Sequence, residues 1–275
     1  MDMITTRGLR MPKLGLGTFR LKGEACREAV ERALSLGYRH VDTAEMYGNE
    51  VEVGAAIAGA RLPRNDIHLT TKVWWEHLGP DQIRASLEAS LAKLKTDHVD
   101  LYLIHWPAPD MDLPAALAAL VRLQEEGMAR AIGVSNFPVA LLRRAVEEVG
   151  APITVNQVEY HVLLGQDAVL GYARAHDVAL TAYCPLAQGK LAGHEELGVI
   201  AAKHGATPAQ VALKWLLDQP GVAAIPKAAR RESQVANLEA MKLVLDDADR
   251  AAIAALPKAQ RMVNPGFAPA WDRAA

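Results

Sequence analysis

Eight short apolar runs alternate with longer amphipathic stretches along the whole chain. The central runs are almost entirely apolar, which is typical of strands buried on both faces of a parallel sheet. Eight strand–helix units without an internal repeat or linker predict an α/β fold with one (β/α)8 barrel over residues 1–275. The runs are residues 14–18, 40–44, 67–73, 99–106, 129–135, 153–160, 179–185 and 222–227.

The alternative is an open, doubly wound sheet, which usually carries a Gly-rich fingerprint after its first strand. GLGTF (15–19) is followed by LKGEA, so no G-x-G-x-x-G forms here. Two segments lie outside the eight units. Residues 3–12 are expected to form a β-hairpin that turns at Arg7-Gly8 and caps the bottom of the barrel. Residues 258–275 are expected to form a C-terminal loop over the pocket.

Charge and composition limit the partners of this chain. A formal charge of -2 gives no reason to expect nucleic acid or an anionic membrane surface. Two cysteines indicate a reducing compartment and supply neither a disulfide framework nor a metal site. The sequence has no signal-peptide core and no bilayer-spanning apolar run. We expect a soluble, cytoplasmic monomer that acts on a small molecule.

Four polar residues sit at the ends of three neighbouring runs: Asp42, Tyr47, Lys72 and His105. In a parallel barrel these ends open on one face, so we expect the four side chains to share a pocket. Taken singly, Asp42 could be a helix cap, Tyr47 a packed aromatic and His105 a satisfied structural histidine, whereas a lysine that ends an apolar run, as Lys72 does, is rarely just packed. Together they suit proton transfer to a carbonyl oxygen, with Lys72 expected to lower a tyrosine pKa that is ordinarily near ~10.

The chain resembles the aldo-keto reductases over essentially its whole length. GYRHVDTAEMYGNE, TTKVWW and LIHWP are similar to the family's segments around its Asp, Tyr, Lys and His. AIGVSNF, NQVEYH, AYCPLAQG and IPKAARRESQVANL are similar to its cofactor segments, in the same order. The tail RMVNPGFAPAWD resembles the bacterial group that acts on 2,5-diketo-D-gluconate and methylglyoxal.

The resemblance implies an NADPH-dependent reductase of aldehydes, α-dicarbonyls or keto-sugars. Tyr47 would be the general acid, Lys72 and Asp42 would tune it, and His105 would orient the substrate. Ser135, Asn136 and Gln157 would hold the nicotinamide carboxamide, and Tyr183 would stack on the ring. The implied cofactor-binding residues are Thr18, Phe19, Ser135, Asn136, Gln157, Tyr183, Pro185, Leu186, Gln188, Lys227, Ser233 and Asn237.

The segment that would hold the 2′-phosphate departs from the family pattern. Relatives tend to carry an Arg where this chain has Ser233, which cannot form a charge-assisted contact. Arg230 and Arg231 are near enough in sequence to substitute, or they form a solvated helix start. We therefore expect a reduced preference for NADPH and measurable use of NADH.

Aromatic side chains gather near the predicted strand ends, which suits an apolar cleft for varied small carbonyls. The predicted substrate-binding residues are Phe19, Tyr47, Trp74, His105, Trp106 and Trp271.

Three rival functions remain open at this stage. An aldolase would use Lys72 as a Schiff base but would leave Tyr47 without a role. A metal hydrolase needs clustered histidines and carboxylates, whereas the histidines here are dispersed. A non-enzymatic nucleotide-binding subunit would not need the four polar residues at the strand ends.

Overall fold

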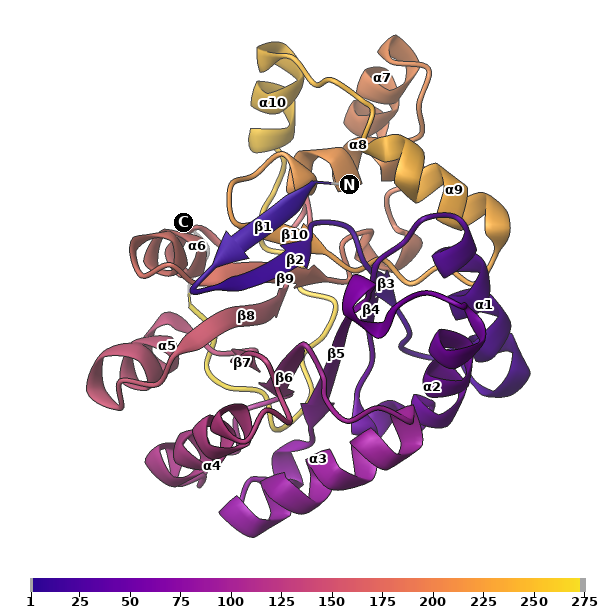
Figure 1. The fold of residues 1–275 in the computed structure, drawn as a ribbon. Helices are drawn as coiled ribbons and strands as arrows, with labels where there is room; N and C mark the ends of the chain where they lie inside the picture. Colours follow the sequence, from indigo (N-terminus) through magenta and orange to yellow (C-terminus); the bar gives the residue numbers. More distant parts are fainter. Residues whose placement is uncertain (1, 273–275) are drawn as a thin grey trace.

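A computed structural model describes residues 2–272, in which the predicted runs form one ring of parallel strands (Figure 1). Each crossover joins neighbouring strands, and bridges from Leu14 to Ala224 and from Gly17 to Lys227 close the ring between the first and last strands. The predicted (β/α)8 barrel is therefore confirmed. Its strands are β3 (Leu16–Gly17), β4 (His40–Asp42), β5 (His68–Val73), β6 (Leu101–Ile104), β7 (Ile132–Ser135), β8 (Ile153–Glu159), β9 (Ala179–Tyr183) and β10 (Val222–Ala224).

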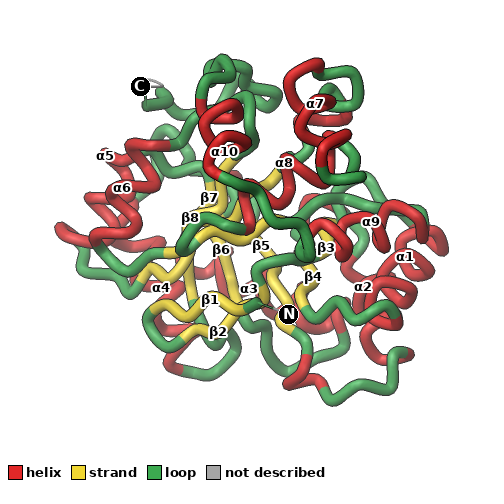
Figure 2. The backbone as a smooth tube through the Cα atoms, turned by 90° about the horizontal axis from the view of Figure 1, so that it is seen from above, coloured by secondary structure: helices red, strands yellow, loops and turns green. Residues whose placement is uncertain are grey.

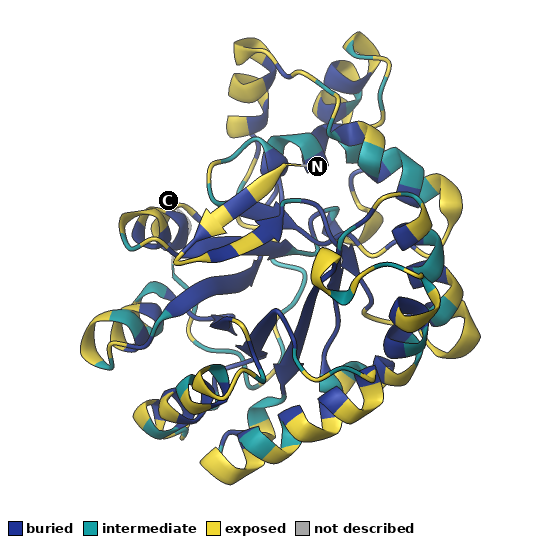
Figure 3. Cartoon of the chain, in the orientation of Figure 1, coloured by how far each residue is buried: buried dark blue, intermediate teal, exposed yellow. Residues whose placement is uncertain are grey.

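The helices surround this ring, with buried faces turned inward and exposed faces outward (Figure 3). Two of them, α7 and α10, were not predicted; they pack together over Leu197, Ile200 and Ile253 beside the barrel. The helices are α1 (Gly23–Ser35), α2 (Glu50–Gly59), α3 (Pro80–Leu94), α4 (Leu113–Glu125), α5 (Val139–Arg143), α6 (Asp167–Ala175), α7 (Glu195–Lys203), α8 (Pro208–Leu217), α9 (Arg231–Ala240) and α10 (Asp247–Ala254).

Local sequence signals set several helix ends. The Thr207 side chain accepts from the backbone N–H of Gln210 in a capping box that begins α8. The helical stretch after β7 is not regular throughout. After α5, residues Arg144–Glu148 form a π-turn in which the Val149 N–H donates to the Arg144 carbonyl.

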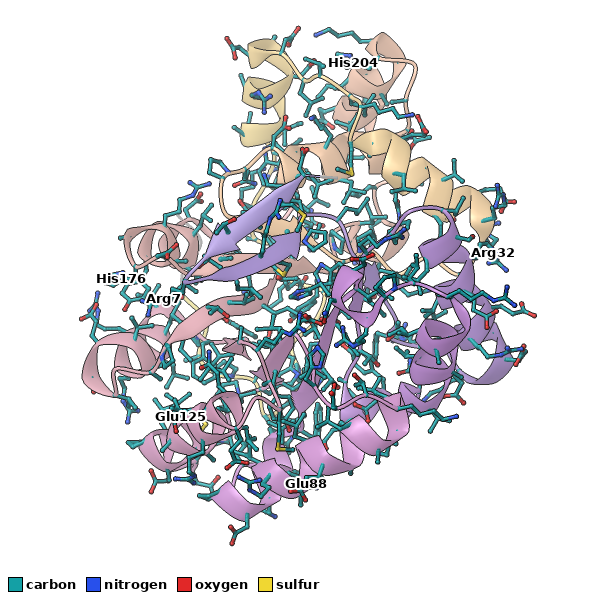
Figure 4. The ribbon with its side chains drawn as sticks, viewed as in Figure 1. Arg7, Arg32, Glu88, Glu125, His176 and His204 are labelled. Atoms are coloured by element: carbon teal, nitrogen blue, oxygen red, sulfur yellow. The ribbon has the colours of Figure 1, made fainter. Side chains whose placement is uncertain are left out.

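The N-terminal hairpin closes one end of the barrel, as predicted. Strands β1 (Met3–Thr6) and β2 (Leu9–Pro12) pair antiparallel and bury apolar side chains against the inward-facing residues of the ring. Both turn residues have positive φ, 43° at Arg7 and 81° at Gly8, which matches a tight two-residue hairpin turn. The Arg7 guanidinium donates to the carbonyl of His176, its neighbour in Figure 4.

The C-terminal segment lies at the opposite end of the barrel from the hairpin (Figure 2). After α10, Ala259 forms a single antiparallel β-bridge with Leu164. The chain then crosses the carboxyl ends of the strands without regular structure. Phe267 packs there against Trp74, Trp75 and Trp106. The predicted loop over the pocket is thus present through Asp272, and residues 273–275 lie outside the described part.

None of the helices in residues 2–272 combines the length and apolarity that a bilayer crossing requires.

Candidate active site

The carboxyl ends of three adjacent strands bring the four predicted catalytic residues together. Asp42 is the last residue of β4, Lys72 lies near the end of β5, and His105 directly follows β6. Tyr47 comes from a short 3-10 helix (Glu45–Tyr47) after β4. Asp42 lies opposite Thr70, two residues before Lys72, and Lys72 lies opposite Leu103, two residues before His105, so the three positions step regularly from one strand to the next.

The Lys72 ammonium is fully buried and has three acceptors for its three N–H groups. Nζ lies 2.6 Å from Asp42 Oδ1, 2.7 Å from the Thr43 carbonyl and 3.5 Å from Tyr47 Oη. An ammonium can only donate, so the Tyr47 oxygen is the acceptor of this contact. The phenolic hydrogen is therefore left to point away from Lys72.

The pKa of Tyr47 is raised well above its ordinary value, first because burial disfavours the phenolate and then because of the Asp42 charge. The sequence led us to expect that Lys72 lowers this pKa, and the structure differs. The reason is that burial of the phenol dominates, and the Lys72 ammonium lies nearer to Asp42 than to Tyr47. Tyr47 therefore holds its proton at neutral pH, as a proton donor must.

His105 is a neutral group within this site. Burial, followed by repulsion from Lys72, lowers the pKa of His105 well below its ordinary value. Its ring packs edge-on against Tyr47 and Trp74, with centroids 5.6 Å and 5.3 Å away. Within the described residues its Nδ1 has no hydrogen-bond partner. A neutral imidazole supplies one N–H donor for an oxygen in the pocket.

A hydrogen-bonded layer on β7–β9 supports the four residues. Gln157 Nε2 donates to Asp42 Oδ2 at 2.8 Å, so both Asp42 oxygens are bonded. Asn136 Nδ2 donates to the His105 carbonyl at 3.0 Å, and Asn136 Oδ1 accepts from the Tyr183 hydroxyl at 2.7 Å. Ser135 Oγ donates to the Gln157 carbonyl. The amide and hydroxyl groups predicted to hold the nicotinamide thus lie next to the four.

A cavity of about 540 Å³ opens beside this layer. Thr18, Lys72 and Ser135 are buried behind the cavity and do not line it. They hold residues that do line it in place; Thr18 Oγ1, for example, donates to the Asp42 carbonyl. The predicted residues that line the cavity are Phe19, Asp42, Tyr47, His105, Trp106, Asn136, Gln157, Tyr183, Pro185, Leu186, Gln188 and Lys227.

Two cations reach the cavity away from the buried pair. Lys227 was predicted from the sequence, whereas Arg20 was missed. The one sequence signal for Arg20 is that a basic side chain comes soon after the end of a predicted strand. Arg20 lies over the Phe19 ring and is close enough to Cys184 for its charge to favour the thiolate, although burial raises the pKa of Cys184 to about 11. Among residues 2–272 neither cation has an ion-pair partner, so both can meet an anionic cofactor.

The backbone between Tyr183 and Gly189 is unusual. Cys184, Ala187 and Gln188 have φ values of 48°, 46° and 54°, in the left-handed region that non-glycine residues rarely adopt. Strain of this kind collects at ligand-binding segments, and this one lines the cavity. Ser233 and Asn237 lie on α9 and do not line it.

Aromatic rings form the other end of the site. Phe19 is 44% exposed, with its ring 5.1 Å from that of Tyr47. Trp106 lines the cavity, and Trp271 packs on Trp106 at 6.0 Å. Trp74 does not line the cavity but packs against His105, which does. Met46 and Val263 also line it and were not predicted.

A larger hollow of about 860 Å³ lies at the hairpin end, far from these groups. Its lining residues are mainly arginines and backbone-paired hairpin residues, and Asp100, its buried acid, is paired with Arg130. The residues with convergent chemistry line the smaller cavity, which is the better candidate site.

Comparison with known proteins decides the family. The sequence model described as the aldo/keto reductase family matches residues 13–258. The chain belongs to the aldo/keto reductase family. This membership agrees with the resemblance seen in the sequence, and it makes the chain an oxidoreductase that uses a nicotinamide cofactor.

Individual members of the family are similar over nearly the whole chain. Methylglyoxal reductase DkgB of Salmonella typhimurium is 46% identical over 268 residues, which cover 96% of this chain and 100% of the relative. Glyoxal reductase of Bacillus subtilis is 40% identical over 256 residues, covering 93% and 92%. A crystal structure of a candidate 2,5-diketo-D-gluconic acid reductase B superposes with a TM-score of 0.96 at 42% identity, covering 99% and 98%.

Proposed function

We propose that this reductase converts aldehydes, α-dicarbonyls and keto-sugars to alcohols, with Tyr47 as the proton donor. The observation that carries the proposal is the direction of the Lys72 contact. The ammonium donates to Tyr47 Oη, so the phenolic O–H is free to donate into the cavity that Tyr47 lines. The names of the relatives support small dicarbonyls as substrates.

Each residue of the site has a distinct part in this proposal. His105, held neutral by burial, donates a hydrogen bond that orients the carbonyl oxygen beside Tyr47. Tyr47 then gives its proton to that oxygen as negative charge develops there. Lys72 already donates to Tyr47 Oη, and this contact stabilises the phenolate that remains. Asp42 holds Lys72 in place at 2.6 Å.

The reduced nicotinamide supplies the hydride that the carbonyl carbon accepts. Gln157 and Asn136 would hold its carboxamide, although the N–H groups of Asn136 are already bonded to the His105 carbonyl and to Ser135. Their side-chain oxygens are therefore the groups to accept from the carboxamide nitrogen. Arg20 and Lys227 are placed to meet the pyrophosphate or ribose phosphate.

The choice between the two nicotinamide cofactors depends on α9. We propose NADPH as the cofactor with measurable use of NADH, because Ser233 lacks charge and the exposed Lys227 is the remaining cation of the motif. Arg230 and Arg231 are exposed at the start of α9 and carry no ion pair within the described residues, so they are available to a 2′-phosphate. Cytoplasmic location and a monomeric state stay predictions.

The rival functions find less support. A Schiff-base lysine needs a free amine in the pocket, whereas Lys72 is fully buried and bonded to three acceptors. Residues 2–272 bring no three histidine, cysteine or carboxylate side chains together as a metal hydrolase would need.

The test is cofactor oxidation by the purified protein with NADPH and NADH in parallel. Methylglyoxal, glyoxal, 2,5-diketo-D-gluconate and simple aldehydes form the substrate panel. We expect turnover with the dicarbonyls, and Tyr47→Phe should lower it by about 10²-fold or more while binding of the cofactor, followed by quenching of tryptophan fluorescence, is retained. A wild-type protein that oxidises neither cofactor with any of these carbonyls would overturn the proposal.

A further inference from the structure

The carboxylate of Glu159 fastens the C-terminal segment to the end of β8. This side chain is fully buried. Its Oε1 accepts from the Met262 N–H at 2.6 Å, and its Oε2 accepts from the Val263 N–H at 2.9 Å. The sequence did not single out Glu159, and the proposed reaction gives it no part. A buried charge with two backbone donors from one distant segment is a specific anchor.

Two further groups complete this anchor. His161 Nε2 donates to Glu159 Oε1 at 3.0 Å, and its Nδ1 accepts from the Leu163 N–H, which fixes one tautomer. The Arg261 guanidinium lies 3.9 Å from Glu159 Oε2 and 3.8 Å above the Trp271 ring. Glu159 is thus connected through Arg261 to a residue ten positions further along the chain.

The far end of the segment has an anchor of its own. Asp272 Oδ2 accepts from the backbone N–H of Val139 at 2.9 Å, at the first turn of α5. The N-cap of α5 is Pro138, which offers no capping side chain, so Asp272 supplies the missing acceptor from outside. The ends of the segment also meet, since Trp271 Nε1 donates to Asn264 Oδ1 at 2.8 Å.

Residues 263–272, here called the strap, therefore form a closed loop over the aromatic end of the cavity. Val263 lines the cavity directly. Phe267 stacks on Trp75 at 4.9 Å and meets Trp74 and Trp106 edge-on at 5.6 Å and 5.5 Å. Trp74 in turn contacts His105. The rings that shape the substrate end are held partly by the strap.

We infer that Glu159 and Asp272 are positioning residues for the carbonyl substrate, because they clamp the two ends of the strap over the aromatic end of the site. This inference rests on the proposed function and extends it. The strap contacts the aromatic rings and not the buried pair or the cations, so loosening it weakens the binding of substrate much more than proton transfer or the binding of cofactor. The substrate class that gains from the closed strap is a small carbonyl compound, which is enclosed by these rings.

The two anchors allow a matched set of variants. Asp272→Ala removes the acceptor for the Val139 N–H, whereas Asp272→Asn keeps an oxygen of the same reach. Glu159→Gln keeps the shape but places an NH2 group against one of the two strap N–H donors. Thr207→Ala is the control, because it removes a helix-capping oxygen at α8, outside the strap.

The measurements are steady-state kinetics with methylglyoxal and hydrogen exchange of the peptide covering residues 259–272. For Asp272→Ala we expect KM to rise about fivefold or more with kcat changed less than about threefold, which is the mark of lost ground-state binding. Hydrogen exchange of the strap amides, called strap exchange below, should accelerate. The dissociation constant of NADPH should stay constant. Glu159→Gln should show the same pattern more strongly, while Asp272→Asn and Thr207→Ala should resemble the wild type in KM and strap exchange.

The outcomes separate the inference from the proposed function. If the wild type reduces methylglyoxal but Asp272→Ala and Glu159→Gln leave both KM and strap exchange unchanged, the inference is wrong and the proposed function stands. If strap exchange accelerates but kcat falls with KM constant, the strap serves the chemical step and not substrate positioning, which also overturns it. If the wild type reduces no carbonyl, the proposed function fails first, and the inference fails with it.

Discussion

Lys72 Nζ lies 2.6 Å from Asp42 Oδ1, and both side chains are almost completely removed from solvent. Burial lowers the pKa of Lys72, and the charge of Asp42 and its hydrogen bond oppose that change. Asp42 also accepts a hydrogen bond from the Gln157 amide, and Lys72 also donates to the Tyr47 hydroxyl oxygen. One buried ion pair thus couples the stability of the barrel to the proposed proton donor.

Breaking this pair on one side should destabilise the protein. Lys72→Met leaves the Asp42 charge buried without a cation, and we expect the free energy of unfolding in urea to fall by about 3–5 kcal/mol. Asp42→Asn in the same background should restore part of that loss, because it removes the unpaired charge. Equal losses in the single and double variants would contradict the coupling.

Tyr47→Phe removes the proposed proton donor and keeps the ring. The packing against Phe19 and His105 is retained, so the thermal midpoint should change little. We expect kcat for methylglyoxal to fall about 10²–10⁴-fold, the usual contribution of a general acid. Phe19→Leu serves as the control, since it perturbs the same contact without removing a proton. A Tyr47→Phe variant with turnover close to wild type would exclude the donor role.

The sequence was sufficient for the barrel, because a parallel sheet covered by helices imposes an apolar run on every strand. It also placed Asp42, Lys72 and His105 at strand ends, where the register of neighbouring strands brings them together. It did not reveal Glu159 or Asp272. Their partners are backbone N–H groups of distant segments, and a contact with the backbone leaves no pattern in side-chain types.

The pKa of Tyr47 could not be predicted for a related reason. Its direction is set first by burial of the phenol and then by the charge of Asp42, and neither the burial nor the distance to Asp42 can be read from residue types. Arg20 was missed because a single basic residue after a strand end is common on protein surfaces.

The closure of the barrel depends on the absence of a side chain at Gly17. A Cβ there would lie 2.5 Å from the Ile225 carbonyl oxygen, beside the bridge that joins the first and last strands. Gly17→Ala should lower the free energy of unfolding by about 1–3 kcal/mol, as overpacking does. Gly171 lies in α6 with open space around it, so Gly171→Ala should instead stabilise by roughly 1 kcal/mol. Chemical denaturation of both variants checks the opposite signs.

Stability should fall at mildly acidic pH because of two buried histidines below the site. The rings of His40 and His68 meet at 4.6 Å. Burial lowers the pKa of both, and for His68 the charges of His40, Arg64 and Arg130 lower it further. The unfolded chain therefore binds more protons than the folded one below an unfolded pKa of about 6.5.

The contribution of the two neutral histidines to the free energy of unfolding is fully present above about pH 6.5. It is lost as the pH falls toward their folded pKa values, at about 1.4 kcal/mol per pH unit for each histidine. Urea unfolding between pH 7.5 and pH 5.5 measures the slope. His68→Gln should flatten it by about one proton. A slope that His68→Gln does not alter would show that other groups dominate.

Cofactor choice offers a test on α9, which carries none of the four proposed catalytic residues. Ser233→Arg supplies a guanidinium for the 2′-phosphate, and a charge-assisted contact is worth about 1.5–3 kcal/mol, or roughly 10–100-fold in binding. We expect the ratio of kcat/KM for NADPH over NADH to rise by about that factor while kcat stays constant. Glu239→Arg adds positive charge at an exposed position further along the same helix and should leave the ratio nearly unchanged. A wild-type ratio already strongly in favour of NADPH, unaltered by Ser233→Arg, would mean that Arg230 and Arg231 hold the phosphate in its place.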